Sequence, residues 1–421
     1  MRSLRKQPTL LLALLVGVAL LLTMTKLEGD GGVRAAYSGG DDDDDDDDEA
    51  DETDEFDFFS SNLDFVATGR DDAAVADCEG QQCSAADGAA HVAIPSVLKR
   101  GLVTKKPKVQ DILKEHARFA TDVSTKAFSG ETLGYVTPWN NRGYDFAKLF
   151  RAKFTYISPV WLQIREDGKT HTPVVTGTHD IDAQWMRAVR GDEDGIGPKI
   201  VPRVVYERNK LASTDVPLII TQLLDLAEEH AFDGFVFEIP VVEGTMDLLL
   251  RMGDAFQDAK KLLLLVLNRS TKGGKLPITH DMFDQLLPLV HRFSMNAYDY
   301  QTPGPNAPFL WLQTTLNALT DAEKEKILLG VPFYGYDNTD AVTGPSFIST
   351  LKNEDVKKIR WDANAHECHH EYYTSFGGDH HVAFFPCLQF LYDRLQLYEQ
   401  NGVGAAIWEL GQGLDYFYDL L

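Results

Sequence analysis

Basic side chains are in short supply in this chain of 421 residues. Lysine and arginine number 40 against 64 aspartates and glutamates, which leaves a formal net charge of −24 at pH 7. Proteins that bind nucleic acid present a basic stripe or patch, and nothing here supplies one, so nucleic acid is disfavoured as a partner. A Gly-x-Gly-x-x-Gly run after an early strand is also missing. The nucleotide-binding form of a doubly wound sheet, the alternative fold, therefore lacks support.

Cysteine is rare as well. The chain has four, namely Cys78, Cys83, Cys368 and Cys387. In an oxidising compartment each pair that is close in sequence could form a disulfide, a prediction that rests on proximity alone. Five histidines crowd the second pair: His366, His369, His370, His380 and His381. Their spacing matches no standard zinc site, so we expect exposed hairpin histidines and predict no metal and no cofactor.

An apolar run of full membrane-spanning length is absent from the start of the chain. Three basic residues precede an apolar stretch from Leu10 to Met24, which is short for a comfortable span. This pattern is typical of a signal peptide, predicted for residues 1–28, and an uncleaved signal anchor is the alternative. Either way we expect the chain to enter the secretory pathway, and to meet a membrane only if the segment stays uncleaved.

Residues 29–72 are dominated by acid, with an unbroken run of eight aspartates from Asp41 to Asp48. Such dense like charge repels itself and cannot bury a core, so we predict a disordered, solvated segment rather than a cation-binding one. Residues 73–130 are largely polar, with a helix predicted near Gln110–Ala120, and we interpret them as a linker and lead-in.

From residue 131 to residue 421, strand-like apolar runs alternate with helical patterns, which predicts parallel βα units. The predicted strands are Leu133–Thr137, Thr155–Leu162, Ile200–Tyr206, Phe232–Glu238, Leu262–Leu267, Arg292–Tyr298, Ile327–Pro332 and Gly404–Glu409. The predicted helices are Ile181–Arg190, Pro217–Glu229, Thr245–Ala259, Asp281–Val290, Leu310–Leu319 and Leu388–Glu399. Eight strands with helices between them favour the α/β class and a TIM (β/α)8 barrel over residues 131–421.

The segment Tyr336–Phe385 between the seventh and eighth strands is predicted to be a short insertion. We expect a helix near Asn353–Ile359 and a hairpin over Glu371–Phe385, because Gly377-Gly378 provides a turn.

The stretch from Phe232 to Pro240 is read as a buried strand that ends in an acid. Side chains alternate along a strand, so Glu238 and Pro240 share one face. Phe235 and Phe237 share the other face, which suits the helix side of a βα barrel. The pattern therefore predicts Glu238 inside the barrel near its C-terminal mouth, where active sites lie, with a buried structural glutamate as the alternative.

This strand resembles the fourth-strand signature of family 18 glycoside hydrolases, Asp-x-x-Asp-x-Asp-x-Glu. Other runs resemble further strands of the family in the same order: Leu133–Trp139 the first, Met295–Tyr300 the sixth, Ile327–Gly335 the seventh and Gly402–Glu409 the eighth. The resemblance implies a TIM barrel, a secreted or lysosomal location, and glycan partners of the chitooligosaccharide or N-acetylglucosamine type.

The match departs from the family at its most consequential position. Asp233 takes the first acid position, Glu238 the third, and Pro240 that of the proton-donating glutamate. A proline cannot protonate a glycosidic oxygen, and general acid catalysis typically contributes roughly a hundred- to ten-thousand-fold. The resemblance therefore implies a chitinase-like, carbohydrate-binding protein with absent or weak hydrolase activity, and we assign no catalytic residue.

The resemblance also implies which residues hold the glycan. Trp408 would lie under a sugar ring, Tyr298 would assist the N-acetyl carbonyl, and Asp299 would bond a sugar hydroxyl. The full predicted substrate-binding set is Trp139, Trp161, Glu238, Tyr298, Asp299 and Trp408. For the four aromatic residues the alternative is a place in the core, where large aromatics are commonly found.

Two other functions stay open on the sequence. An active glycosidase would use a relocated acid, Glu238 or Glu243. Glu238 lies one alternation, ~6–7 Å, too deep along the strand for a donor that must come within roughly 2.6–3.2 Å of the oxygen. A protein-interaction scaffold with a vestigial sugar pocket is the other possibility, with a protein receptor as its partner.

A single N-glycosylation sequon is present in the chain, Asn268-Arg269-Ser270, and it makes Asn268 the predicted acceptor.

Overall fold

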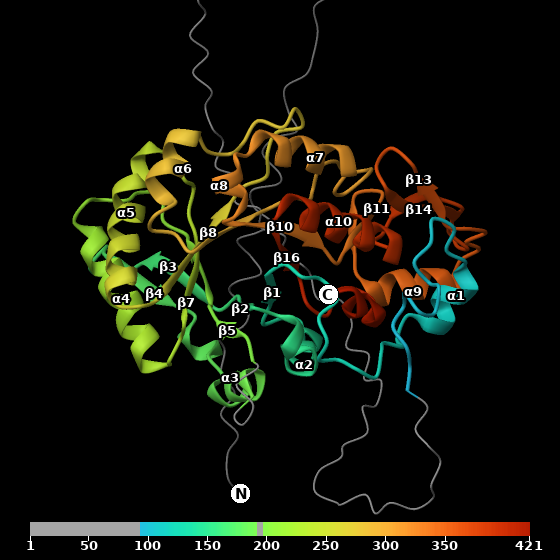
Figure 1. Cartoon of the computed structure of the whole chain (residues 1–421), viewed down its shortest axis with the longest axis horizontal. Helices are drawn as coiled ribbons and strands as arrows, with labels where there is room; N and C mark the ends of the chain where they lie inside the picture. The colour runs from blue at the N-terminus through green and yellow to red at the C-terminus, as the bar shows by residue number, and fades with distance from the viewer. Residues whose placement is uncertain (1–92, 192–196) are drawn as a thin grey trace, which may run out of the picture. The chain divides into compact units, whose positions relative to one another are not determined.

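The computed structural model describes residues 93–191 and 197–421, which are coloured in Figure 1. The predicted signal peptide, the acidic segment and the Cys78–Cys83 pair lie outside these residues. Within the described ranges, no helix combines the length and the apolar character needed to cross a membrane.

A curled, mainly parallel sheet forms the centre of the described chain. Its parallel strands follow the order β3 (Leu162–Glu166), β6, β7, β8, β9, β10, β16, β1, β2, β5. They are β1 (Thr132–Val136), β2 (Tyr156–Pro159), β5 (Lys199–Ile200), β6 (Arg203–Tyr206), β7 (Gly234–Glu238), β8 (Leu262–Leu267), β9 (Arg292–Met295), β10 (Ile327–Pro332) and β16 (Gly404–Trp408). Only Val201 and Pro202 separate β5, at one end of this order, from β6, which pairs with β3 at the other end. The α/β class predicted from the sequence is confirmed.

Two of the predicted strands are divided in the structure. The second becomes β2 and β3 (Leu162–Glu166), and the third becomes β5 and β6. Pro202 stands at the second break. It has no N–H to donate to a neighbouring strand, which explains why regular pairing stops there. β3 also pairs with an antiparallel strand, β4 (Pro173–Thr176), that the sequence pattern does not predict.

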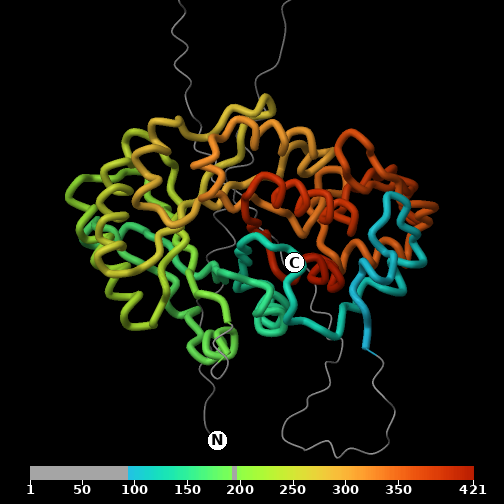
Figure 2. Tube along the Cα trace, in the orientation of Figure 1, coloured from blue at the N-terminus to red at the C-terminus, as the bar shows by residue number. Residues whose placement is uncertain are grey.

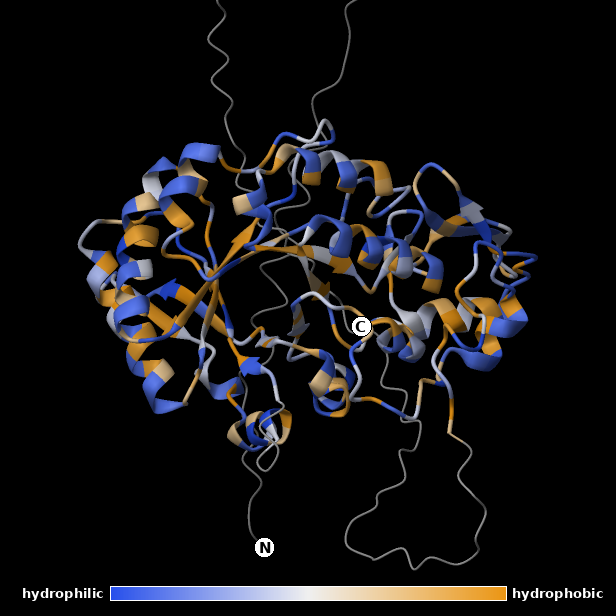
Figure 3. Cartoon of the chain, in the orientation of Figure 1, coloured by the Kyte–Doolittle hydropathy of each residue, from blue (hydrophilic) through white to orange (hydrophobic). Residues whose placement is uncertain are grey.

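Alternate side chains of the sheet enter two separate apolar clusters. Tyr135 and Val236 belong to the inner cluster, whereas Phe235 and Phe237 pack with the helices in the larger outer cluster. Burying a phenylalanine stabilises the fold by roughly 1.5–3 kcal/mol, so the outer cluster fixes which face of β7 points inward. This arrangement places Glu238 on the inner face. Figure 3 shows the apolar strands surrounded by helices that carry both polar and apolar residues.

Helices connect the strands and cover the outer side of the sheet (Figure 1). They are α2 (Asn141–Leu149), α3 (Ala183–Arg190), α4 (Asp215–Glu229), α5 (Glu243–Asp258), α6 (His280–Leu286), α7 (Phe309–Ala318), α8 (Asp321–Lys324) and α10 (Leu388–Asn401). Asp182 caps α3, because its carboxylate accepts a hydrogen bond from the Trp185 N–H at 2.8 Å. The sequence pattern does not predict α2, which contains Gly143, or the single turn of α8.

The insertion between β10 and β16 is more elaborate than its predicted helix and hairpin. It holds a five-stranded sheet in the order β12, β11, β15, β14, β13. These strands are β11 (Gly335–Asp337), β12 (Asp340–Val342), β13 (Arg360–Asp362), β14 (Glu367–Tyr373) and β15 (His380–Phe384). The helix predicted near residues 353–359 is wrong: α9 spans Gly344–Asn353, where Pro345 in the first turn favours a helix start. Val356 and Ile359 are buried in the irregular segment that follows.

A disulfide joins Cys368 on β14 to Cys387, the residue that precedes α10. The sequence separation is 19 residues, so the bond ties the insertion sheet to the last helix. Closing a loop of this length corresponds to about 3 kcal/mol of loop entropy. We expect Cys368→Ala combined with Cys387→Ala to lower the free energy of unfolding by about 2–4 kcal/mol in urea denaturation. Adding reductant to the double variant should change nothing further, and a loss below about 1 kcal/mol would contradict this role.

Residues 93–130, the described part of the predicted linker, are packed against the end of the chain. Asp419 accepts hydrogen bonds from the N–H groups of Val97 at 2.9 Å and Ala120 at 2.7 Å. α1 (Val109–Glu115) lies beside α9, and Figure 2 shows this early segment next to the late one. The lead-in is therefore part of the folded unit, which a free linker would not be.

Candidate functional site

The carboxyl ends of the parallel strands bring several predicted binding residues to one edge of the sheet, which we call the carboxyl edge. Trp408 ends β16, and its ring centre lies 5.2 Å from that of Tyr135 on β1. The Arg203 guanidinium, from β6, lies 4.9 Å from the centre of the Trp408 ring and 5.8 Å from that of Tyr135. A half-buried indole ring and a cation therefore share the inner side of this edge.

Glu238, at the end of β7, forms an ion pair with Arg203 at the carboxyl edge. The side chains of Arg203 and Glu238 are 16% and 25% exposed, so the pair is largely removed from solvent. Burial tends to lower the pKa of Arg203, but the Glu238 carboxylate and two nearby tyrosines more than offset this, and the pKa is raised. Glu238 thus serves as the counter-ion of a mostly buried guanidinium. A carboxylate in such a pair accepts hydrogen bonds from the guanidinium.

Pro240 and Glu243 follow β7 at the same edge. The Pro240 carbonyl accepts a hydrogen bond from the Thr245 hydroxyl at 2.7 Å, which fixes the turn into α5. Glu243 is exposed in the first turn of α5, where a negative charge stabilises a helix N-terminus. The position that the family signature assigns to the proton donor is thus occupied by a residue without a titratable group.

Tyr298 follows β9, and its hydroxyl donates to the side-chain oxygen of Asn296 at 3.0 Å. Deeper in the sheet, the hydroxyls of Tyr135 and Ser294 share a hydrogen bond of 2.8 Å. Burial raises the pKa of Tyr298 well above its ordinary value and that of Tyr135 to about 12. Both tyrosines therefore keep their protons at neutral pH and remain hydrogen-bond donors on the inner face.

Asp299 has a left-handed backbone, with a φ of 59°. Its N–H donates to the side-chain oxygen of Asn306 at 2.7 Å. Its carboxylate accepts hydrogen bonds from the hydroxyl of Tyr334 and, at 2.7 Å, from that of Tyr336. These partners hold a conformation that residues other than glycine seldom adopt. One carboxylate oxygen of Asp299 is consequently already bonded within the protein.

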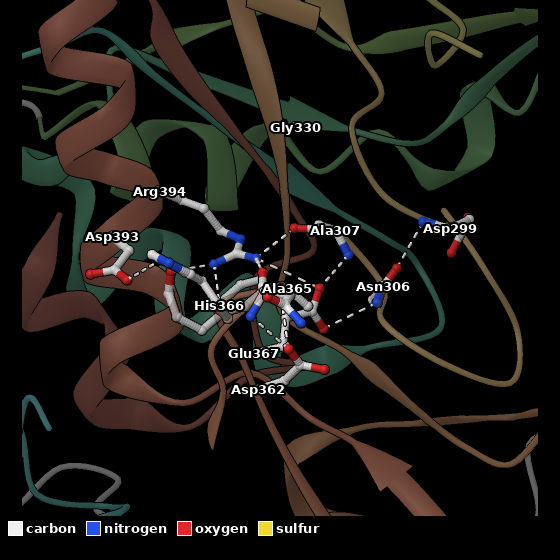
Figure 4. Close-up of polar contacts among 12 residues, drawn as sticks. Asp299, Asn306, Ala307, Gly330, Asp362, Ala365, His366, Glu367, Asp393 and Arg394 are labelled. Atoms are coloured by element: carbon white, nitrogen blue, oxygen red, sulfur yellow. Dashed lines mark hydrogen bonds and ion pairs between the residues drawn. The ribbon is translucent and has the colours of Figure 1, made fainter. Parts of the chain in front are cut away.

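Asn306 is held in turn by a buried ion pair, drawn in Figure 4. The Glu367 carboxylate accepts hydrogen bonds from the backbone N–H groups of Asn306 at 3.1 Å and Ala307 at 2.7 Å. Arg394 of α10 lies 3.6 Å from the same carboxylate. Its guanidinium also donates to the backbone carbonyls of Ala307, Ala365, His366 and Phe390. The insertion sheet and the last helix thus support the loop that positions Asp299.

The two remaining predicted aromatics differ in their surroundings. Trp161 is fully buried. Its indole N–H donates to the Tyr144 hydroxyl at 2.7 Å, and its ring centre lies 5.7 Å from that of Trp185. The structure therefore places Trp161 in the outer core, the alternative raised for it, because packing against the helices leaves its ring no face for a sugar. Trp139, in the loop after β1, is 60% exposed.

Glu409 is a buried carboxyl group that the sequence pattern does not single out. It follows Trp408 and is 1% exposed. One carboxylate oxygen accepts hydrogen bonds from the Gln412 amide at 2.9 Å and the Asn140 amide at 3.4 Å. Burial raises the pKa of Glu409 to about 7, although hydrogen bonds from its neighbours act in the opposite direction.

This shift makes the stability of the fold depend on pH. Between the ordinary pKa of 4.5 and about 7, folded Glu409 binds a proton that the unfolded chain has released, so stability falls as pH rises. We expect Glu409→Gln to remove a fall on the order of 3 kcal/mol between pH 4.5 and pH 8, measured by urea denaturation at both pH values. Glu228→Gln, at an exposed position on α4, should keep the original slope. The same slope in both variants would contradict the assignment.

Two histidines of the insertion bond separate carboxylates. His381 bonds Asp337 at 2.8 Å, and His366 bonds Asp393 at 2.7 Å. His370 is 1% exposed, contrary to the predicted exposed hairpin histidines, because its side of β14 packs on α9 and Phe385. Burial lowers the pKa of His370 to about 4. Across residues 93–191 and 197–421, no group of three or more His, Cys, Asp or Glu side chains could hold a metal ion.

Solved structures with this fold include chitinases. The chitinase of Chromobacterium violaceum superposes with a TM-score of 0.59 at 18% identity, over 69% of this chain and 98% of that one. A class V chitinase of Pseudomonas fluorescens gives a TM-score of 0.58 at 16% identity, over 69% of this chain and 98% of that one. A family 18 chitinase of Cycas revoluta, in complex with allosamidin, gives 0.56 at 12% identity, again over 69% and 98%.

At these identities the likeness shows the fold, and it supports the fold family implied by the strand motifs. No family model matches the chain. The described residues therefore share the α/β fold, with its curled parallel sheet, of family 18 chitinases.

Proposed function

We propose that this chain is a chitinase-like protein that binds N-acetylglucosamine oligomers or related glycans and hydrolyses them weakly or not at all. The finer architecture that we propose is a TIM (β/α)8 barrel with an insertion between its seventh and eighth strands, which the pairing order of the sheet supports. The observation that carries the proposal is the carboxyl edge. There the Trp408 ring lies beside the Arg203–Glu238 pair, and Pro240 stands in the position of the acid.

Binding rests on the match between these groups and the surface of a sugar ring. A pyranose has an apolar face of C–H groups and a rim of hydroxyl groups. The half-buried Trp408 ring suits the apolar face, while Glu238 and Asp299 supply acceptors for the hydroxyl rim. The Tyr298 hydroxyl, protonated at neutral pH, donates to Asn296 in the free chain and would have to exchange that hydrogen bond for one to an N-acetyl carbonyl.

Weak or absent hydrolysis rests on the state of three carboxyl groups near the carboxyl edge. Glu238 neutralises Arg203. Glu243 lies on the surface in the first turn of α5. Glu409 has the pKa of a general acid, but it is buried and hydrogen-bonded to Gln412. A donor must come within roughly 2.6–3.2 Å of the leaving oxygen, and the ion pair, the surface position and the burial of these three groups argue against such an approach.

Two likenesses point to the ligand class and the location. A double mutant of the Cycas revoluta chitinase is known in complex with (GlcNAc)4, a ligand that we transfer to this chain as part of the proposal. The runs Tyr135–Asn140, Ile157–Leu162 and Trp408–Tyr416 resemble chitinase domain-containing protein 1. On this likeness and the N-terminal signal pattern we propose a secreted or lysosomal protein, with a protein receptor as an additional partner.

Calorimetric titration of the chain with chitotetraose tests the proposal. We expect saturable binding with a dissociation constant below about 1 mM, equivalent to roughly −4 kcal/mol. A flat response up to millimolar ligand would overturn it and favour the scaffold function. In that case a protein partner should bind Trp408→Ala as well as the unchanged chain.

A further inference from the structure

Asn268, the acceptor of the single sequon, lies at the carboxyl edge of the sheet. β8 ends at Leu267, which pairs in register with Met295 of β9. The Asn296 N–H extends this ladder by donating to the Leu267 carbonyl at 2.9 Å. Asn268 is therefore next to Asn296, whose side-chain oxygen accepts the hydrogen bond of the Tyr298 hydroxyl. The sequon and the proposed saccharide site share one short stretch of the edge.

The side of the sheet that Asn268 faces follows from the alternation of β8. Leu264 and Val266 belong to the inner apolar cluster, so the next position of the same parity, 268, continues their side at the end of the strand. Asn268 is exposed, as an acceptor that carries a sugar must be. A group attached to its amide nitrogen would extend from the protein at the carboxyl edge of the sheet, on the inner side.

The loop that follows Asn268 is anchored, so the attachment point is fixed. The Ser270 hydroxyl shares a 2.5 Å hydrogen bond with that of Thr315. The Trp311 indole N–H donates to the Thr271 carbonyl at 3.0 Å. The Lys272 ammonium lies 5.0 Å from the centre of the Tyr300 ring, and Tyr300 is the residue that follows Asp299. Because Ser270 is buried in the folded chain, the sequon must be used before this loop folds.

We propose that Asn268 carries an N-linked glycan whose first two sugars cover the saccharide site and act as a tethered competitor for it. In the transfer, the Asn268 amide nitrogen forms a bond to C1 of the first N-acetylglucosamine. The bond from C1 to the pyrophosphate of a lipid-linked oligosaccharide donor breaks, and one amide proton is released. The core of such a glycan is two β1,4-linked N-acetylglucosamines, the same unit as in a chitooligosaccharide.

Covalent attachment to Asn268 is what would allow the two N-acetylglucosamines to compete with a free oligosaccharide. A ligand held by a short linker reaches an effective concentration in the millimolar range, comparable with or above the dissociation constant expected for a free oligosaccharide. The inference rests on the proposed binding function and on entry into the secretory pathway. Removal of the glycan should then tighten the apparent binding of added chitotetraose by at least ~threefold, since competition ends.

The test uses the full chain secreted from eukaryotic cells. Glycopeptide mass spectrometry over residues 265–275 reports occupancy, and titration with chitotetraose reports affinity before and after treatment with a peptide N-glycosidase. Asn268→Gln removes the acceptor. Arg269→Gln is the matched control, since it alters the neighbouring exposed side chain and keeps the sequon. Asn268→Asp controls for the aspartate that the glycosidase leaves behind.

We expect occupancy in the unchanged chain and in Arg269→Gln, and at least threefold tighter binding in Asn268→Gln and in the enzyme-treated chain. An unoccupied Asn268 in the secreted protein, or an affinity unchanged by glycan removal, would overturn the inference.

A second readout separates this inference from the proposed function. Acrylamide quenching of Trp408, taken as the difference between the chain and Trp408→Phe, needs no added sugar. Stronger quenching after glycan removal supports a glycan that covers the saccharide site, even if neither the glycosylated nor the deglycosylated chain binds chitotetraose. If neither chain binds and the quenching is also equal, the proposed cover is overturned.

Discussion

Replacing Arg394 with alanine is expected to destabilise the fold by about 3–5 kcal/mol, the range for breaking a buried ion pair by removing one partner. The Arg394 side chain is fully buried, 3.6 Å from the Glu367 carboxylate. Its loss leaves that carboxylate without a counter-ion, and burial already raises the pKa of Glu367 above its ordinary value. Several backbone carbonyls also lose their donor, and each unsatisfied buried group costs about 1–3 kcal/mol. Urea denaturation at pH 7 measures the loss.

Three further variants sharpen this test. Arg394→Lys keeps the charge without the fork of N–H groups, so we expect an intermediate loss. Arg394→Met combined with Glu367→Leu removes both charges together and should be milder than Arg394→Ala. Arg251→Ala breaks an exposed pair with Asp247 at 3.4 Å and should change stability by less than about 1 kcal/mol. A similar small change for Arg394→Ala would contradict the role assigned to the pair.

Replacing Trp408 with alanine is expected to weaken chitotetraose binding by at least tenfold, equivalent to about 1.4 kcal/mol. The ring is the largest apolar surface assigned to the saccharide site, and truncating a well-packed aromatic anchor commonly removes this much or more. The ring also packs beside Tyr135 and under the Arg203 guanidinium, so Trp408→Phe should retain part of the affinity. Calorimetric titration of the variants measures the change, with circular dichroism to verify folding.

Trp361→Ala provides the matched control for this variant. Trp361 is also half-buried, but it belongs to β13 of the insertion sheet and packs near His366. We expect less than a twofold change in affinity for it, within the range of contacts that carry little binding energy. Equal effects of Trp361→Ala and Trp408→Ala would remove the saccharide site from the carboxyl edge.

Much of the sheet follows from the sequence because buried parallel strands are near-continuous apolar runs. Ile327–Pro332 and Leu262–Leu267 coincide with β10 and β8 for this reason. The breaks in the second and third strands depend on Pro202 and on pairing with neighbouring strands, which a local pattern does not contain. The insertion sheet is built partly from strands of three residues, such as β11 and β12, too short to show a period.

The residues of the candidate site also fall into two groups: those that a local sequence pattern indicates and those that depend on partners distant in sequence. The structure brings Trp408, Tyr298, Asp299 and Glu238 to one edge, as expected where the carboxyl ends of parallel strands meet, and their role in binding stays a prediction. Arg203, Glu367 and Asn306 were missed, because their importance lies in partners distant in sequence. A charged residue inside the apolar run of residues 200–206 is the one signal in the sequence that could have identified Arg203. Glu409 ends the eighth-strand motif, in which only Trp408 was assigned a role. The burial of Glu409 becomes apparent only in the folded structure.

The central claim is that a chitinase fold retains a sugar site and lacks a usable proton donor. Its most direct test is a long incubation of the chain, at saturating concentration, with chitotetraose, followed by mass spectrometry of the sugar. The account predicts that the tetrasaccharide is bound and recovered intact. Shorter oligosaccharides that disappear with Glu238→Gln or Glu409→Gln would contradict it, because one of these carboxyl groups would then deliver the proton.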